Sequence, residues 1–154
     1  MKVELFFVGK TTDKYLIEGL KIYLKRLQHY IQVSEVIISP ASGTDQNKVL
    51  KEEGDNMLSK IKARDLVILL DDKGTMLSSE ELAAKMQKWM VEGHSKLIFI
   101  SGGAYGLSDS LRKRANFILS ASRFTFTHQM IRLILAEQLY RAMTIIRNES
   151  YHHG

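Results

Sequence analysis

The sequence of 154 residues contains no cysteine and a single proline, Pro40. Without cysteine, the chain has no disulfide framework, no thiol nucleophile and no zinc site built on thiolates. No apolar run approaches the ~20 residues that span a bilayer, and the N-terminus lacks a basic segment followed by an apolar stretch of signal-peptide length. We therefore expect a cytoplasmic protein without a membrane partner.

The composition is that of a globular protein with an excess of positive charge. Hydrophobic residues make up 45% of the chain and charged residues 25%, which is enough to build a core and excludes wholesale disorder. The length suits one domain over residues 1–154. Lysine and arginine total 22 against 17 aspartates and glutamates, a net charge of +5. This balance favours a polyanionic partner, with nucleic acid as the first candidate.

Apolar runs alternate with segments of helical periodicity along the whole chain. Strands are expected over residues 3–8, 33–38, 66–70, 97–100 and 117–119. Helices are expected over residues 13–29, 48–61, 78–92, 108–115 and 128–147, the third of them opened by a capping box at Ser78–Glu81. This alternation predicts an α/β domain with a mostly parallel sheet and helices on both faces.

The segment Leu66–Leu70 is continuously apolar, which is typical of a strand buried on both faces of a parallel sheet. Such sheets bind ligands at the carboxyl ends of their strands. The segments after Leu70, Ser101 and Leu119 are therefore the candidate ligand-binding loops. We expect Asp71–Gly74 to form a solvated turn.

Short motifs exclude some kinds of site and leave others open. Gly9-Lys10-Thr11 is similar to the end of a Walker A loop, but Glu4 stands where that motif requires glycine, so we expect a plain strand-to-helix turn. Gly102, Gly103 and Gly106 permit either a tight turn or close approach of a ligand to the backbone. The five histidines lack H-E-x-x-H spacing and there is no G-x-S-x-G, so we predict no metal site and no hydrolase of those types.

The chain closes on Tyr151, His152 and His153. Tyrosine and histidine rings stack on unpaired bases and hydrogen-bond to them, and histidine transfers protons near neutral pH. The segment is therefore either a substrate-binding tail or a frayed terminus.

Several motifs, in this order and spacing, resemble the ribosomal large-subunit methyltransferase H family of SPOUT (α/β-knot) methyltransferases. These motifs are Val8-Gly9-Lys10, Leu70-Asp71 with Gly74, Ile100-Ser101-Gly102-Gly103-x-x-Gly106-Leu107, Ser120-x-Ser122, Thr125-Phe126-Thr127-His128-Gln129-Met130-x-Arg132, Glu137-Gln138-Leu139-Tyr140-Arg141-Ala142 and the closing Tyr151-His152. The resemblance covers essentially the whole chain.

The resemblance implies an S-adenosylmethionine-dependent enzyme that methylates N3 of a pseudouridine in 23S ribosomal RNA, with the assembled ribosome as substrate. It also implies a homodimer and a C-terminal trefoil knot in which the cofactor binds. The cofactor pocket would comprise Leu70, Gly102, Ala121, Ser122, Arg123, Phe124, Thr125 and Phe126.

The same resemblance assigns the substrate chemistry to the tail. Tyr151 and His152 would be the catalytic residues and would act across the dimer interface, and His153, Arg132 and Arg141 would contact RNA. Many family members carry Arg or Lys where this chain has His153, and a neutral imidazole binds phosphate less well than a guanidinium.

Two other functions remain open from the residues alone. One is a phosphate- or nucleotide-binding α/β enzyme that uses Gly9-Lys10-Thr11, and the other is a basic RNA-binding module without catalysis. The last helix has a broad apolar face, part of which could pair with a second copy of the chain. This face comprises Ile131, Ile134, Leu135, Leu139, Ala142, Met143 and Ile146.

Overall fold

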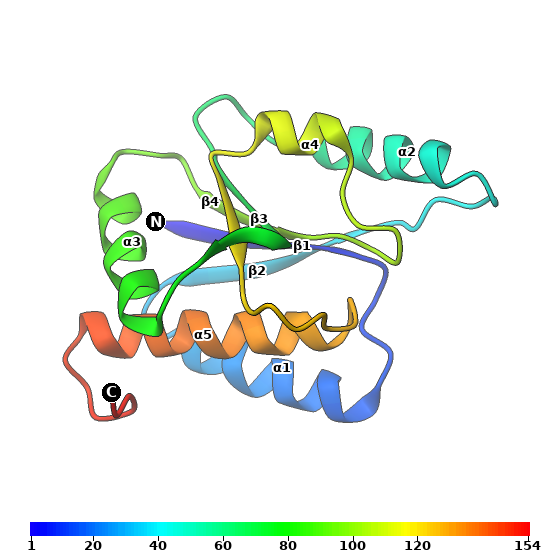
Figure 1. The fold of residues 1–154 in the computed structure, drawn as a ribbon. Helices are drawn as coiled ribbons and strands as arrows, with labels where there is room; N and C mark the ends of the chain where they lie inside the picture. Colours follow the sequence, from blue (N-terminus) through cyan, green and yellow to red (C-terminus); the bar gives the residue numbers. More distant parts are fainter.

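The computed structural model describes all residues, 1–154, and its centre is one parallel sheet of five strands (Figure 1). The strands lie in the order β2-β1-β4-β3-β5, and every neighbouring pair is parallel. Their bounds are Lys2–Val8 (β1), Gln32–Ile38 (β2), Leu66–Met76 (β3), Leu97–Ser101 (β4) and Phe117–Ser120 (β5). The predicted parallel α/β architecture is confirmed.

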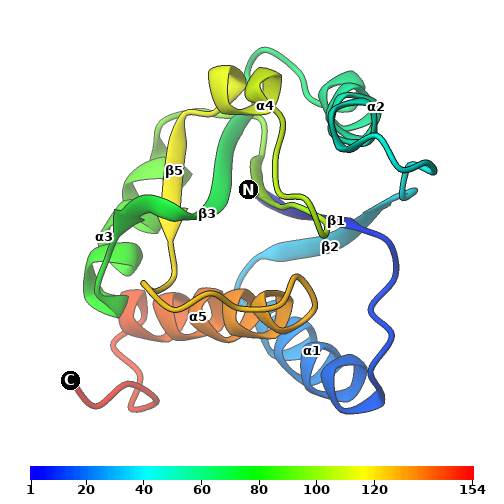
Figure 2. The ribbon, with the colours of Figure 1, turned by 45° about the vertical axis from the view of Figure 1, so that its right-hand side comes forward.

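Five helices cover the two faces of the sheet (Figures 1 and 2). They are α1 (Lys14–Leu27), α2 (Gln46–Ser59), α3 (Ser79–Val91), α4 (Asp109–Arg114) and α5 (Met130–Ile146). Helices α1, α3 and α5 bury apolar side chains in one core with one face of the sheet, and α2 and α4 share a second core with the other face. None of the helices combines the length and the apolar character needed to cross a membrane.

The helix boundaries follow from side-chain caps. The capping box is present as predicted: Ser78 accepts from the Glu81 amide, and the Glu81 carboxylate accepts from the Ser78 amide. Helix α2 begins at Gln46, two residues earlier than predicted, because the Asp45 side chain accepts from the amides of Asn47 and Lys48.

Strand β3 corrects one prediction, because the expected turn at Asp71–Gly74 does not form. The chain continues as a strand to Met76 and pairs again with β5, at Thr75 with Leu119, after a shift in register. A Cβ atom at Gly74 would lie 2.6 Å from the carbonyl oxygen of Ile118, so only glycine permits this approach of two backbones. Turn-forming residues thus serve here as the irregular half of a long strand.

A small ionic cluster closes the amino-terminal edge of the sheet. The Lys96 ammonium lies 2.7 Å from the Glu4 carboxylate and 3.9 Å from that of Asp65, and Lys2 contacts Glu4 at 3.0 Å. Burial raises the pKa of Glu4, but the hydrogen bonds and charges of Lys96 and Lys2 outweigh this, so that the pKa lies below the ordinary value of 4.5.

We expect Lys96→Met to lower the free energy of unfolding by about 2–3 kcal/mol at pH 7, because it leaves the buried Glu4 and Asp65 carboxylates short of a counter-ion. Since the folded-state pKa of Glu4 is depressed, this stabilisation is complete above pH 4.5 and is lost as the pH falls below that value. Urea denaturation at pH 7 and below pH 4 measures both effects. A difference between variant and wild type that does not shrink in acid would contradict this account.

Candidate active site

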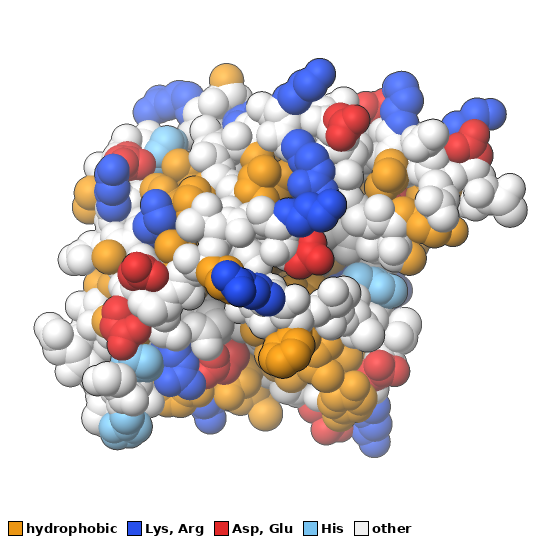
Figure 3. Space-filling model, viewed as in Figure 1, with side chains coloured by type: hydrophobic (Ala, Val, Ile, Leu, Met, Phe, Trp, Pro, Cys, Tyr) orange, Lys and Arg blue, Asp and Glu red, His pale blue; other side chains and the backbone are white.

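The carboxyl ends of β3, β4 and β5 open into the largest cavity of the protein, with a volume of about 620 Å³. Figure 3 shows basic, acidic and hydrophobic side chains meeting near the centre of this face. The lining comprises Leu70, Asp71, Asp72, Lys73, Ser101, Gly102, Gly103, Ala104, Gly106, Leu107, Arg112, Ala121, Ser122, Phe124, Thr125, Phe126, Thr127, His128 and Ile131. This volume is in the range of small-molecule sites.

Sequence reasoning located most of this lining. Of the residues expected to bind a cofactor, all except Arg123 line the cavity; Arg123 is exposed and points elsewhere than the lining. The sheet-edge rule and the family resemblance thus lead to the same place. No group of three or more His, Asp or Glu side chains in the structure could hold a metal ion.

The glycine-rich segment after β4 forms a tight turn that is also a wall of the cavity. Gly103 and Gly106 form a β-bridge, and Gly106 has a φ of +86°. A Cβ atom at Gly102 would lie 2.3 Å from the carbonyl oxygen of Gly106. Both interpretations of these glycines therefore apply, and a side chain at position 102 would displace the turn before it filled the cavity.

The segment after β5 supplies the apolar wall. Ser120 Oγ donates to the Ser122 carbonyl, and Ser122 Oγ accepts from the Phe124 amide, both at 2.9 Å. These bonds fix a bend that leaves Phe124 81% exposed while it lines the cavity beside the half-buried Phe126. Aromatic rings at this edge can cover a planar, apolar ligand.

Asp71 and Arg112 form an ion pair at the cavity wall that sequence reasoning missed. Burial raises the pKa of Asp71, but the Lys73 amide and the Arg112 guanidinium more than offset this and hold the pKa below the ordinary value of 3.8. Asp71 was recognised only as part of a turn, and its position in an extended strand is what turns it towards the cavity.

A smaller, mostly apolar cavity of about 120 Å³ adjoins the first one, since Leu70 and Ala121 line both. It lies between the end of β3, the start of α3 and the middle of α5. Its other lining residues are Leu77, Ser78, Leu82, Leu119, Ser120, Ile134, Leu135 and Gln138.

Arg132 corrects the expectation that it contacts RNA. Its side chain is 1% exposed and donates to the carbonyl oxygens of Val8, Gly9 and His128 and to Thr11 Oγ1. The guanidinium therefore fastens the end of β1 to the start of α5, inside the protein.

The same bonds decide the role of Gly9-Lys10-Thr11. The Gly9 amide donates to the Ile38 carbonyl at 2.8 Å, and Gln129 bonds to the Lys10 carbonyl and the Thr12 amide. These groups are engaged within the protein, as in the predicted strand-to-helix turn and unlike a phosphate-binding loop.

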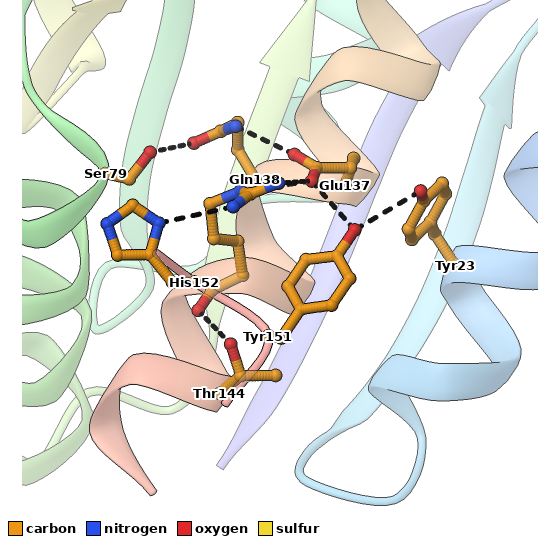
Figure 4. Close-up of polar contacts among 8 residues, drawn as sticks. Tyr23, Ser79, Glu137, Gln138, Thr144, Tyr151 and His152 are labelled. Atoms are coloured by element: carbon orange, nitrogen blue, oxygen red, sulfur yellow. Dashed lines mark hydrogen bonds and ion pairs between the residues drawn. The ribbon is translucent and has the colours of Figure 1, made fainter. Parts of the chain in front are cut away.

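The chain terminus folds back onto α5 and is ordered by aromatic packing (Figure 4). The Tyr151 ring packs edge-on against Tyr140, with centroids 4.7 Å apart, and its hydroxyl donates to Glu137 Oε1 at 3.0 Å. The Arg141 guanidinium lies 4.7 Å from the centre of the Tyr151 ring. Burial and the hydroxyl contacts with Tyr23 and Glu137 raise the pKa of Tyr151 well above 10.

His152 lies between a base and an acid. Arg141 Nη1 is 3.2 Å from Nδ1 of His152, and Glu80 Oε1 is 2.8 Å from Nε2. Because a guanidinium only donates, Nδ1 must be the unprotonated nitrogen and Nε2–H donates to Glu80. His153 is exposed, whereas Arg141 is half-buried and bonded to Glu137.

The terminal residues and the cavity lie apart within one chain. Neither Tyr151 nor His152 lines either cavity. The large cavity reaches α5 at Ile131, whereas the tail contacts α5 at Glu137 and Arg141, roughly two to three helical turns further on.

Comparisons with known proteins agree with this geometry. A family described as "Predicted SPOUT methyltransferase" matches residues 1–152. Ribosomal RNA large subunit methyltransferase H of Christiangramia forsetii is 46% identical to the chain over 156 residues, covering 99% of both. The protein of the same name from Natranaerobius thermophilus is 45% identical over 159 residues, covering 99% of this chain and 100% of the relative.

Solved structures share the fold at low identity. A probable methyltransferase of Bordetella pertussis aligns with a TM-score of 0.55 and 12% identity, over 92% of this chain and 95% of that one. The SpoU methyltransferase AviRb of Streptomyces viridochromogenes, solved in complex with AdoMet, aligns with a TM-score of 0.52 and 11% identity, over 96% of this chain and 58% of that one.

We expect Tyr151→Ala to lower the free energy of unfolding by about 1–2 kcal/mol, because it removes the edge-on contact with Tyr140 and the hydrogen bond to Glu137. Tyr151→Phe should lose only the hydrogen-bond part. His153→Ala, which alters an exposed side chain, is the matched control and should leave the urea midpoint unchanged. Equal stability of all three variants would mean that the terminus does not pack on α5.

Proposed function

The chain belongs to the SPOUT methyltransferase family, and on that basis we propose that it transfers a methyl group from S-adenosylmethionine to N3 of a pseudouridine in 23S ribosomal RNA. The observation that carries the proposal is the full-length match to relatives named ribosomal RNA large subunit methyltransferase H, together with a cavity at the matching residues. We propose the assembled ribosome as substrate, and hence a cytoplasmic site of action.

The large cavity fits S-adenosylmethionine in size and in chemistry. Phe124, Phe126 and Leu70 offer apolar surface for the adenine, and the backbone of the Gly102–Gly106 turn can approach the ribose without a Cβ in the way. When bound there, the cofactor supplies a methyl group activated by its sulfonium. The protein's contribution is to hold this donor in line with the acceptor nitrogen.

The tail would bind the target nucleotide. Tyr151 and His152 form the aromatic–imidazole pair suited to an unpaired base, and the exposed His153 is free for a phosphate. The N3–H bond must lose its proton as the methyl arrives, and we propose that His152 accepts it. For that, Nδ1 must first leave Arg141. We assign Arg141 to holding the tail, and Arg132 to holding the fold.

We also propose a homodimer and a knotted C-terminal segment. In the homodimer, the tail of one chain would reach the cavity of the other, since the two lie apart on α5 within one chain. Ile131, Ile134 and Ile146 remain partly exposed and could contribute to the interface. The knot would involve the 120–129 segment, which follows β5 where the end of β3 passes close against it.

The alternative functions have less support. A nucleotide-binding role of Gly9-Lys10-Thr11 is disfavoured by the engagement of that turn with Ile38, Gln129 and Arg132. A purely RNA-binding module would have no need of the large cavity.

One experiment tests the function directly. Mass spectrometry of ribosomal RNA from a strain lacking the chain should show loss of one N3-methylpseudouridine, and restoring the chain should return it. An unchanged modification pattern would sink the proposal.

We expect His152→Ala to reduce the rate of methyl transfer about 10²-fold while changing RNA affinity little, because it removes the proton acceptor rather than a binding surface. His153→Arg should keep full activity and bind RNA at least as tightly, since it restores a permanent positive charge. Single-turnover methylation and filter binding on the same ribosomes separate rate from affinity. A rate of His152→Ala equal to wild type would remove the catalytic assignment.

A mixing experiment tests the shared site. A chain lacking residues 151–154 and a Gly102→Val chain should each be inactive, the first without a tail and the second with a displaced cavity wall. Co-refolded, they should regain about a quarter of the wild-type activity, because half of the dimers are mixed and each contains one intact site. Mixtures as inactive as either parent would show that tail and cavity must belong to one chain.

A further inference from the structure

One ion pair joins two elements across the wall of the large cavity. Asp71 comes from the irregular half of β3, and Arg112 comes from α4. The Asp71 side chain is 9% exposed and that of Arg112 is 37% exposed. The other charged side chains of the lining are Asp72, Lys73 and His128, and none of them forms a salt bridge.

The two walls of the cavity differ in character. Helix α4 lies on the α2 side of the sheet and contributes Arg112, whereas the segment with Phe124 and Phe126 leads to α5 on the opposite side. A ligand that fills the cavity therefore meets aromatic rings at one wall and an ion pair at the other. The ligand that matches this polarity has an apolar planar end and a charged end.

The ion pair suits a zwitterion better than a single charge. Arg112 already neutralises Asp71, so the pair attracts an isolated cation or anion only weakly. A ligand with an ammonium beside a carboxylate can instead place each group against the opposite member of the pair. Charge-assisted bonds of this kind are the strong ones in proteins.

The two partners are prepared for this to different degrees. The Lys73 amide donates to Asp71 Oδ1 at 2.8 Å, which fixes the carboxylate independently of Arg112. Arg112 has no other bonded partner for its side chain and is the more exposed of the two. Arg112 is thus the member that can shift to receive a carboxylate while Asp71 stays in place.

We propose that Asp71 and Arg112 together bind the amino-acid end of S-adenosylmethionine, Asp71 its α-ammonium and Arg112 its α-carboxylate. This assignment rests on the proposed function, because it presumes that the cavity is the cofactor site.

Two ligands isolate the contribution of that end. S-adenosylhomocysteine carries the amino-acid group, whereas 5′-methylthioadenosine has the same adenosine and thioether without it. Calorimetry on the full-length protein should show that the wild type binds S-adenosylhomocysteine more tightly. Asp71→Asn and Arg112→Gln should each weaken S-adenosylhomocysteine on the order of 10- to 100-fold and leave the affinity for 5′-methylthioadenosine within about twofold. Unchanged binding of 5′-methylthioadenosine also reports that the cavity is intact.

Lys113→Gln is the matched control, since it removes a neighbouring exposed charge of α4 that does not line the cavity. The proposal is overturned if both ligands weaken equally in the variants, if neither weakens, or if the wild type binds the two ligands alike. A wild-type protein that binds neither ligand would instead overturn the proposed function, so the two failures are distinguishable.

Discussion

The close passage of the β3 extension against β5 is the constraint on which both cavities and the tail depend. At Gly74 the two backbones approach so closely that no side chain fits. Because the chain stays extended there, Asp71 reaches the large cavity, and Leu77 and Ser78 reach the small one. The same passage delivers Glu80, in the first turn of α3, to His152.

Arg132 stabilises the opposite side of the site by a different means. A buried guanidinium without a carboxylate partner is costly unless its donors are satisfied, and here carbonyl oxygens from β1 and from the start of α5 satisfy them. The segment that ends at His128 is thereby fixed to the end of the first strand. The apolar wall of the cavity is therefore held at both ends, by β5 and by Arg132.

Periodicity was sufficient to predict the strands and helices, because the buried strands are continuously apolar and the helices carry clear caps. It could not predict the second half of β3, since Asp71-Asp72-Lys73-Gly74 has the composition of a turn and only contact with β5 holds it extended. Nor could it separate Arg132 from a surface cation, because burial of a guanidinium depends on distant carbonyl groups. The cofactor residues were located because parallel sheets bind ligands at one edge, whereas the Asp71–Arg112 pair needed coordinates.

The aromatic anchoring of the tail has a consequence for substrate binding. Tyr30 bonds to Glu149, and Tyr151 packs on Tyr140, so the chain is fixed on both sides of Ser150 before any RNA is present. A disordered tail would lose its conformational freedom on binding, at a cost that lowers affinity. Here that freedom is already lost on folding, to contacts with α1 and α5. His152 and His153 thus extend from an ordered base, and only the contacts of His152 with Arg141 and Glu80 must open for the imidazole to meet a nucleotide.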